Sequence, residues 1–291
     1  MNHLPDKYLC STLIHRSQNT VAVRGVFSLP VDDNLGSHET GVYGYDHVGL
    51  GYLGSGLPAL DNQVVGGIAT RAFNLGFFGL NPAATNFSAG TTPAQSYMSS
   101  LKAGGFIPSL SYGYTAGNQY RFGKVLGSLT LGGYDESLIE PNDLIIDFSP
   151  DYKFQIAVIV NSISITTKDT TQDLSSASFM AVVDSTTPYL FLPLEICQQF
   201  EIAFGITYDE ATELYLVNDT LHSRLVDQSA NVTLTLTNST EKAFVDIILP
   251  YRAFDLIAKY PLVANSTRYF PLKRATNSSQ VTLGRAFFQE A

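Results

Sequence analysis

The sequence is poor in the residues that build cross-linked or nucleic-acid-binding proteins. It contains no tryptophan, and its two cysteines, Cys10 and Cys197, are too few for a disulfide scaffold or a cysteine zinc cluster. Charged residues make up only 15%, and 26 acidic residues against 17 Lys and Arg give a net charge of −9. A phosphate-binding surface needs clustered cations, and the densest basic stretch is the pair Lys273-Arg274. We therefore expect no nucleic-acid partner.

Several other kinds of site are also missing. No apolar run approaches the length of a membrane span, so none is expected. The five histidines are scattered and form no H-E-x-x-H motif, so no metal site is predicted. Gly49–Gly54 fits G-x-G-x-x-G, but Ser55-Gly56-Leu57-Pro58 behind it cannot begin the helix that a dinucleotide site requires. No cofactor is implied.

What the chain has is many short β patterns. Apolar residues make up 45%, and apolar/polar alternation with β-branched and aromatic residues predicts short strands divided by Gly, Pro, Asn and Asp. The expected strands include Thr20–Phe27, Val42–Leu50, Val125–Leu131, Phe154–Ile165, Val232–Thr237 and Ala243–Leu249. Three helices are predicted, at Pro93–Lys102, Pro193–Phe204 and Pro250–Lys259. Many strands with few helices predict a mainly β fold.

A weak twofold pattern suggests two lobes. Phe77-Phe78-Gly79 resembles Thr282-Leu283-Gly284, and we interpret both as apolar strands that end in Gly, where another backbone can pass closely. A stretch rich in Pro and Asp, Glu140–Asp151, lies near the midpoint and is a candidate connection between the lobes.

Six N-x-Ser/Thr sequons point to the secretory pathway. They are at Asn86, Asn218, Asn231, Asn238, Asn265 and Asn277. The first ten residues, MNHLPDKYLC, have neither the basic start nor the apolar segment of a signal peptide. This mismatch predicts that the native N-terminus lies upstream of Met1, and that the parent protein is secreted or held in a cell wall.

One carboxylate stands in a distinctive context. In the run Phe179–Pro188, five apolar residues lead to Asp184, which is followed by Ser185, Thr186 and Thr187. A carboxylate at the end of a buried strand needs hydroxyl or amide donors, and these three residues offer them. The same letters also fit a strand that simply exits into a polar turn, so the pattern alone leaves both interpretations open.

Five segments in the same order resemble the pepsin-like aspartic peptidases, in particular divergent secreted fungal members. They are Gly41–Asp46 (the strand after the active-site flap), Gly76–Leu80 and Val281–Gly284 (the apolar-apolar-Gly elements), Gly127–Asp135 (the G-x-L-x-x-G-G-x-D hairpin) and Ala181–Pro193 (the second catalytic loop). The resemblance implies a bilobal double β-barrel monomer, with an N-terminal lobe over residues 1–145 and a C-terminal lobe over 146–291. It also implies a peptide or protein bound in the cleft between the lobes.

In that family, two aspartates, one from each lobe, share a proton and activate a water against the scissile amide. By resemblance Asp184 is the second-lobe aspartate, Ser185 is its hydroxyl partner, and Thr186 and Thr187 are candidate substrate-binding residues.

The sequence departs from the family pattern in three ways. Thr186 stands where the D-[ST]-G signature has Gly, and D-T-G or D-S-G occurs nowhere in the chain. Counting back from Asp184 by the spacing between the two apolar-Gly elements places the first-lobe aspartate before Met1. Asp32-Asp33 is predicted to be a turn rather than a substitute for that aspartate. The chain also stops at Ala291, before the strand that closes the C-terminal lobe in the family. Cys197 then lacks its usual partner and is predicted not to bond Cys10.

Three functions remain open on these grounds. The first is an acid endopeptidase homologue that, as written, is inactive because it carries one catalytic aspartate. The second is a non-catalytic relative that binds a peptide or another ligand. The third is a secreted or cell-wall glycoprotein that uses the fold as a scaffold.

Overall fold

The computed structural model describes residues 21–29, 32–37, 39–52, 54–68, 76–87, 92–118, 120–121, 125–149, 156–175 and 177–291. The chain forms two compact units: unit 1 comprises Met1–Gly113 and Thr130–Asp135, and unit 2 comprises Tyr114–Leu129 and Glu136–Ala291. Residues 114–129 belong to unit 2 because they bond its C-terminal end. Ala116 N donates to Phe288 O at 3.0 Å, and Asn118 Nδ2 donates to Gln289 O at 2.7 Å. This division differs from lobes of 1–145 and 146–291, and the lobe assignment stays a prediction.

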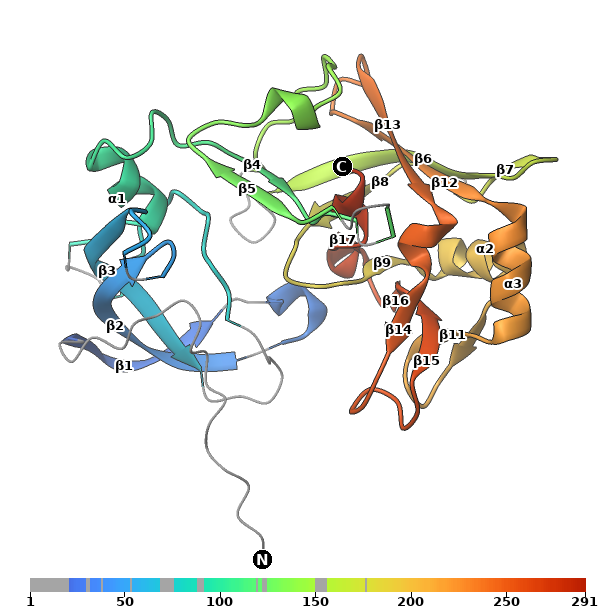
Figure 1. The fold of residues 1–291 in the computed structure, drawn as a ribbon, viewed down its shortest axis with the longest axis horizontal. Coiled ribbons are helices and arrows are strands. Elements are labelled where there is room, and N and C mark those ends of the chain that lie inside the picture. Colours follow the sequence, from blue (N-terminus) through green and yellow to red (C-terminus); the bar gives the residue numbers. More distant parts are fainter. Residues whose placement is uncertain are drawn as a thin grey trace, which may run out of the picture. The chain divides into compact units, whose positions relative to one another are not determined.

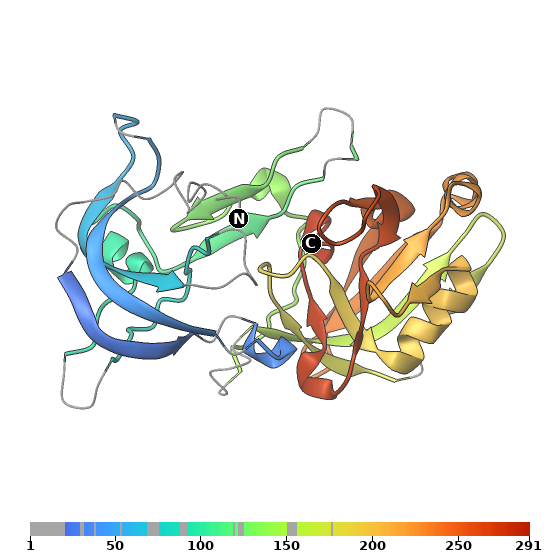
Figure 2. The same ribbon diagram turned by 90° about the horizontal axis from the view of Figure 1, so that it is seen from below.

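Unit 1 contains a three-stranded antiparallel sheet in the order β1-β2-β3. Its strands are β1 (Val21–Leu29), β2 (Glu39–Gly49) and β3 (Ala59–Ile68), and Figures 1 and 2 show them as one curved sheet. Between β1 and β2, Leu35 N and Ser37 N both donate to Asp32 O. The Asp32-Asp33 segment is therefore a turn, as predicted, although strand β1 does precede it.

The core of unit 1 lies under its helix, α1 (Tyr97–Ala103), where Met98 and Leu101 are buried with Ile107. The helix begins four residues later than predicted because Ser96 caps it: the Ser96 side chain accepts a hydrogen bond from Ser99 N at 3.1 Å. The predicted strand at Phe77–Gly79 is wrong, since Gly76–Leu80 has no strand pairing. Strands β4 (Tyr112–Thr115) and β5 (Ser128–Leu131) form a separate two-stranded sheet.

Unit 2 is built on a large mixed sheet whose strands run in the order β13-β12-β6-β8-β17-β9-β16, with β7 paired to β6. Strand β12 shows why it forms: Val232, Leu234 and Leu236 alternate with Thr, and these three apolar side chains are buried. The strands are β6 (Ala157–Thr166), β7 (Thr171–Asp173), β8 (Phe179–Val183), β9 (Leu190–Pro193), β12 (Asn231–Thr237), β13 (Phe244–Pro250), β16 (Leu272–Ala275) and β17 (Thr282–Leu283).

A second sheet in unit 2 has the order β10-β11-β15-β14. Its strands are β10 (Thr207–Asp209), β11 (Leu214–Val217), β14 (Leu256–Ala258) and β15 (Thr267–Phe270). The predicted helix at Pro250–Lys259 is wrong. Only Tyr251–Phe254 makes a short 3-10 turn, after which Leu256–Ala258 pairs with β15. Pairing with a neighbouring strand has overridden the local helical pattern.

Among its described residues, unit 2 also contains two α-helices (Figure 1). Helix α2 (Leu194–Phe204) confirms the prediction, and Gly205 ends it in the left-handed conformation at φ 67°. Helix α3 (Asp219–Gln228) was not predicted. Its signals are Asn218, whose side chain accepts from Leu221 N at 2.8 Å, and the apolar pair Leu221 and Leu225 one turn apart.

Cys197 lies on α2 and is a free, fully buried thiol. Its Sγ donates to Leu192 O at 3.4 Å, and burial raises the pKa of the thiol to about 12. This agrees with the prediction that Cys197 is not bonded to Cys10, which lies outside the described residues.

Candidate active site

Asp184 follows the last residue of β8, in the middle of the large sheet of unit 2. Strand β8 pairs antiparallel with β6 and parallel with β17, so it is held on both sides. Its apolar residues, with Ala181 fully buried, explain why the chain forms a strand up to this point. The Asp184 backbone is fixed by β17 as well, because Asp184 N donates to Leu283 O at 3.1 Å.

The Asp184 carboxylate is partly buried and is bonded to one neighbour. Oδ1 accepts a hydrogen bond from Thr186 N at 2.9 Å and another from Thr186 Oγ1 at 2.8 Å. The resemblance implied Ser185 as the hydroxyl partner, whereas the hydroxyl that reaches Asp184 in the structure belongs to Thr186. Within the described part of the chain, no hydrogen bond to Oδ2 is present, so this oxygen is the one available to a water or ligand.

Thr187 has a structural place in the same loop. It is buried, its carbonyl oxygen accepts from Arg285 N at 2.8 Å, and its Oγ1 accepts from Tyr189 N at 3.4 Å. These contacts brace the loop against the segment after β17. The substrate-binding roles of Thr186 and Thr187 stay predictions.

Gly284 allows this bracing, as expected for an apolar strand that ends in Gly. A Cβ at this position would lie 2.3 Å from Tyr189 O and 2.5 Å from Thr187 O, both of them backbone atoms. Gly284 N donates to Tyr189 O at 3.0 Å, so the two chain segments cross in direct contact. The sequence therefore contained the signal for this crossing in Thr282-Leu283-Gly284.

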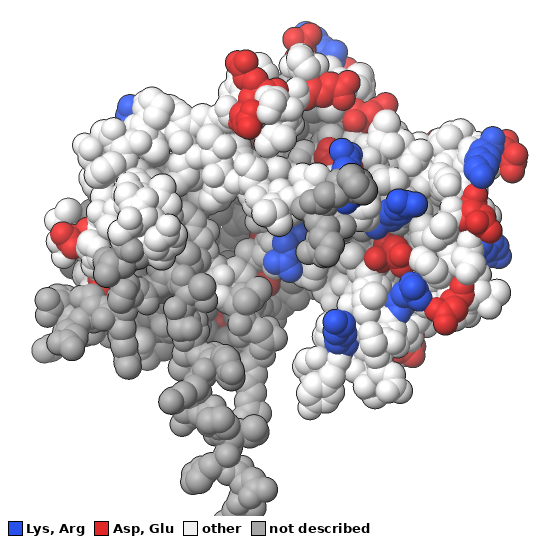
Figure 3. All heavy atoms as spheres, in the orientation of Figure 1, with Lys and Arg blue, Asp and Glu red and all other residues white. Residues whose placement is uncertain are grey.

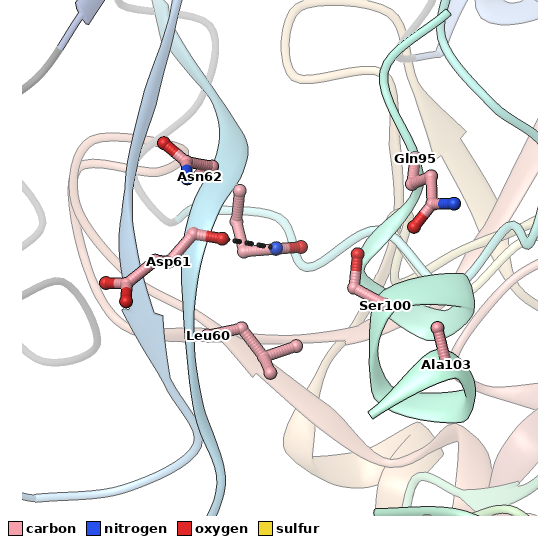
Figure 4. A pocket seen from close by; sticks show the side chains of 7 residues that line it. Leu60, Asp61, Asn62, Gln95, Ser100 and Ala103 are labelled. Atoms are coloured by element: carbon pink, nitrogen blue, oxygen red, sulfur yellow. Dashed lines mark hydrogen bonds between the residues drawn. The ribbon is translucent and has the colours of Figure 1, made fainter. Parts of the chain in front are cut away.

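A separate pocket lies in unit 1 between β3 and α1. It has a volume of about 390 Å³, and Figure 4 shows Ser100 and Ala103 of α1 facing Leu60 of β3 across it. The dashed line in Figure 4 is the hydrogen bond from Gln63 Nε2 to Asp61 O, 2.8 Å long. Its lining holds neither a cysteine nor a histidine and belongs to different elements from those that carry Asp184.

The described residues offer little support for other kinds of site. They contain no group of three or more His, Cys, Asp and Glu side chains that could hold a metal ion. No helix among them is long and apolar enough to cross a membrane. On the face drawn in Figure 3, the described Lys and Arg side chains are scattered among Asp and Glu side chains.

Comparison with known proteins decides the family. Residues 35–289 match the model of the eukaryotic aspartyl protease family. The chain belongs to this family. The structure is similar to the crystal structure of the aspartic proteinase from Irpex lacteus, with a TM-score of 0.61 and 18% sequence identity, over 96% of this chain and 80% of that one. No curated protein sequence matches the chain.

Membership of the aspartyl protease family confirms the mainly β, pepsin-like fold predicted from the five segments. It also gives a chemical context for Asp184, which is the one aspartate of the chain that directly follows an apolar strand and precedes Ser-Thr. The family's reaction requires a second carboxylate. Asp32 and Asp33, the paired acidic residues of unit 1, lie at a turn and the start of a short 3-10 helix.

Proposed function

We propose that Asp184 is the second-lobe carboxylate of an aspartic-endopeptidase pair, and that the chain as printed binds peptides but does not hydrolyse them. The observation that supports this is the geometry of Asp184. It sits at the end of a strand held on both sides, its Oδ1 accepts two hydrogen bonds from Thr186, and Oδ2 is left for a ligand.

The chemistry explains why one such carboxylate is insufficient. In the family's reaction, two adjacent carboxyl groups cannot both be ionised, so one acts as base towards water while the other holds a proton as acid. Asp184 alone can take one of these roles at a time. The sequence has no D-T-G or D-S-G that would supply the other.

We expect the purified chain to cleave a quenched fluorescent peptide between pH 3 and pH 6 no faster than its Asp184→Asn variant does. The aspartic proteinase from Irpex lacteus serves as the positive control for the assay. Cleavage by the chain that disappears in Asp184→Asn would contradict the proposal, whereas cleavage equal in both proteins marks a contaminating protease.

Binding without hydrolysis is supported by Thr186 in particular. Its hydroxyl occupies Oδ1 of Asp184 at 2.8 Å, at the position where the family signature has Gly. A carboxylate fixed in this way can still accept a hydrogen bond from a peptide N–H at its other oxygen.

The chain is also proposed to come from a secreted, glycosylated protein of fungal type. Five sequon asparagines, Asn86, Asn218, Asn231, Asn265 and Asn277, are exposed, as a glycosylated asparagine must be. Asn238 is half-buried, and its Nδ2 donates to Ile145 O at 3.1 Å. After secretion from yeast, we expect mass spectrometry of enzymatically deglycosylated peptides to find modification among these five. Unmodified asparagine at all six would contradict the glycoprotein proposal.

A further inference from the structure

Arg285 is attached directly to the loop that carries Asp184. It follows Gly284, its backbone N donates to Thr187 O at 2.8 Å, and the next amide, of Ala286, donates to Pro188 O at 3.3 Å. Two residues before Arg285, the carbonyl oxygen of Leu283 accepts a hydrogen bond from Asp184 N at 3.1 Å. The backbone of Arg285 is therefore held in a fixed position beside the Asp184 loop, within unit 2.

The side chain of Arg285 is exposed and pairs with no carboxylate in the part of the chain that the structure describes. Arg268 and Arg274 of unit 2 do pair, at 2.7 Å from Asp219 and 2.9 Å from Glu201, whereas Arg224 and Arg252 resemble Arg285 in having no carboxylate partner among the described residues. What distinguishes Arg285 is its place, because its backbone is bonded to the Asp184 loop and its charge is left available to a ligand there.

Aromatic rings cluster where the Asp184 loop runs into β9. The ring of Tyr189 lies 6.1 Å from that of Phe191 and 6.2 Å from that of Tyr269. Burial raises the pKa of Tyr269 to about 12, and burial also raises the pKa of Tyr189, while the positive charge of Arg285 acts in the opposite direction on both phenols.

A second cation approaches the same ring from another strand. Lys273 Nζ lies 5.1 Å from the centre of the Tyr189 ring, and it is balanced by Glu213 at 3.7 Å. Because Lys273 already has a carboxylate, Arg285 is the cation here that remains available to a ligand. The surroundings combine an unbalanced positive charge with partly buried aromatic surface.

We propose that Arg285 is a specificity-determining residue that selects peptides with a carboxylate side chain close to the segment bound at Asp184. A guanidinium recognises a carboxylate through two parallel N–H···O bonds, and the backbone bond from Arg285 N to Thr187 O keeps this residue beside the Asp184 loop. This inference rests on the proposed peptide binding and names the class of peptide that is bound.

The test uses the full chain and two fluorescein-labelled hexapeptides, Leu-Glu-Phe-Phe-Glu-Leu and Leu-Gln-Phe-Phe-Gln-Leu, measured by fluorescence anisotropy at pH 6. In dilute salt, we expect the glutamate peptide to bind about twofold to fivefold more tightly than the glutamine peptide. The ratio should fall towards one in 0.5 M NaCl, because salt screens an exposed charge pair.

Arg285→Gln should abolish this ratio while leaving the affinity for the glutamine peptide unchanged. The control is Lys242→Gln, which removes the same charge from the exposed turn before β13 and should preserve the ratio. A ratio that survives in Arg285→Gln, or equal binding of both peptides to the unmodified chain, overturns the role of Arg285 alone. If neither peptide binds the unmodified chain, the proposed peptide binding fails, and the selectivity fails with it.

Discussion

Gly284→Ala is expected to destabilise unit 2 by roughly 4 kcal/mol or more, enough to prevent most of the protein from folding. The new Cβ would lie 2.3 Å from Tyr189 O and 2.5 Å from Thr187 O. Both are backbone atoms in a braced loop, so neither can rotate away as the end of a flexible side chain could. Moving them would break the hydrogen bonds from Gly284 N to Tyr189 O and from Arg285 N to Thr187 O.

The measurement is the yield of soluble protein, together with urea unfolding followed by circular dichroism. Gly133→Ala is the matched control, because a Cβ at Gly133 would meet no atom within 4 Å. This control should change the free energy of unfolding by less than about 1 kcal/mol. A Gly284→Ala protein as stable as the Gly133→Ala protein would show that the two chain segments do not cross as described.

Phe270→Ala is expected to lower the free energy of unfolding of unit 2 by about 3–5 kcal/mol. The Phe270 side chain on β15 is fully buried among aromatic residues of α2 and of the 3-10 helix Tyr251–Phe254. Its ring stacks on that of Phe254 with centroids 4.5 Å apart, and it lies 5.0 Å from Phe204 and 5.9 Å from Phe200. Truncation to alanine removes this contact area and leaves a cavity that rigid rings cannot easily fill.

The matched control for this prediction is Phe244→Ala on β13, where the phenylalanine is 51% exposed. It should cost less than about 1 kcal/mol, because little apolar area returns to water. Both variants are compared by urea unfolding at the same protein concentration. Equal losses for the two phenylalanines would mean that the core of unit 2 is not centred on the Phe270 cluster.

The strand pattern was largely predictable because it depends on local alternation. Thr-Leu repeats over Val232–Thr237 make one face of β12 apolar, and the strand appears at nearly the predicted bounds. Helix α2 was predictable for a similar reason, since its apolar residues recur at helical spacing and Gly205 can adopt the positive φ that ends it. Both features depend on residues that are close to one another in the sequence.

The predictions failed where contacts with residues far away in the sequence determine the local structure. Leu256–Ala258 has a helical pattern, yet pairing with β15 makes it a strand. Phe77–Gly79 looks like Thr282–Gly284, but only the second segment lies between strands that pair with it. Helix α3 packs on the core through only two apolar residues, Leu221 and Leu225, which is a weak helical pattern. Its capping residue Asn218 was therefore the stronger signal for a helix.

The sequence by itself determined the family and singled out Asp184 as the candidate catalytic residue, a role that stays a prediction. Apolar residues before Asp184, hydroxyls after it and four further motifs in order are local features, and they sufficed for the aspartyl protease family. Only the tertiary structure decided that Thr186 rather than Ser185 binds the carboxylate, and that Arg285 lies against the same loop. Residues 184 and 285 are joined through β17, which inserts between β8 and β9, and a contact across so many residues arises only when the sheet is assembled.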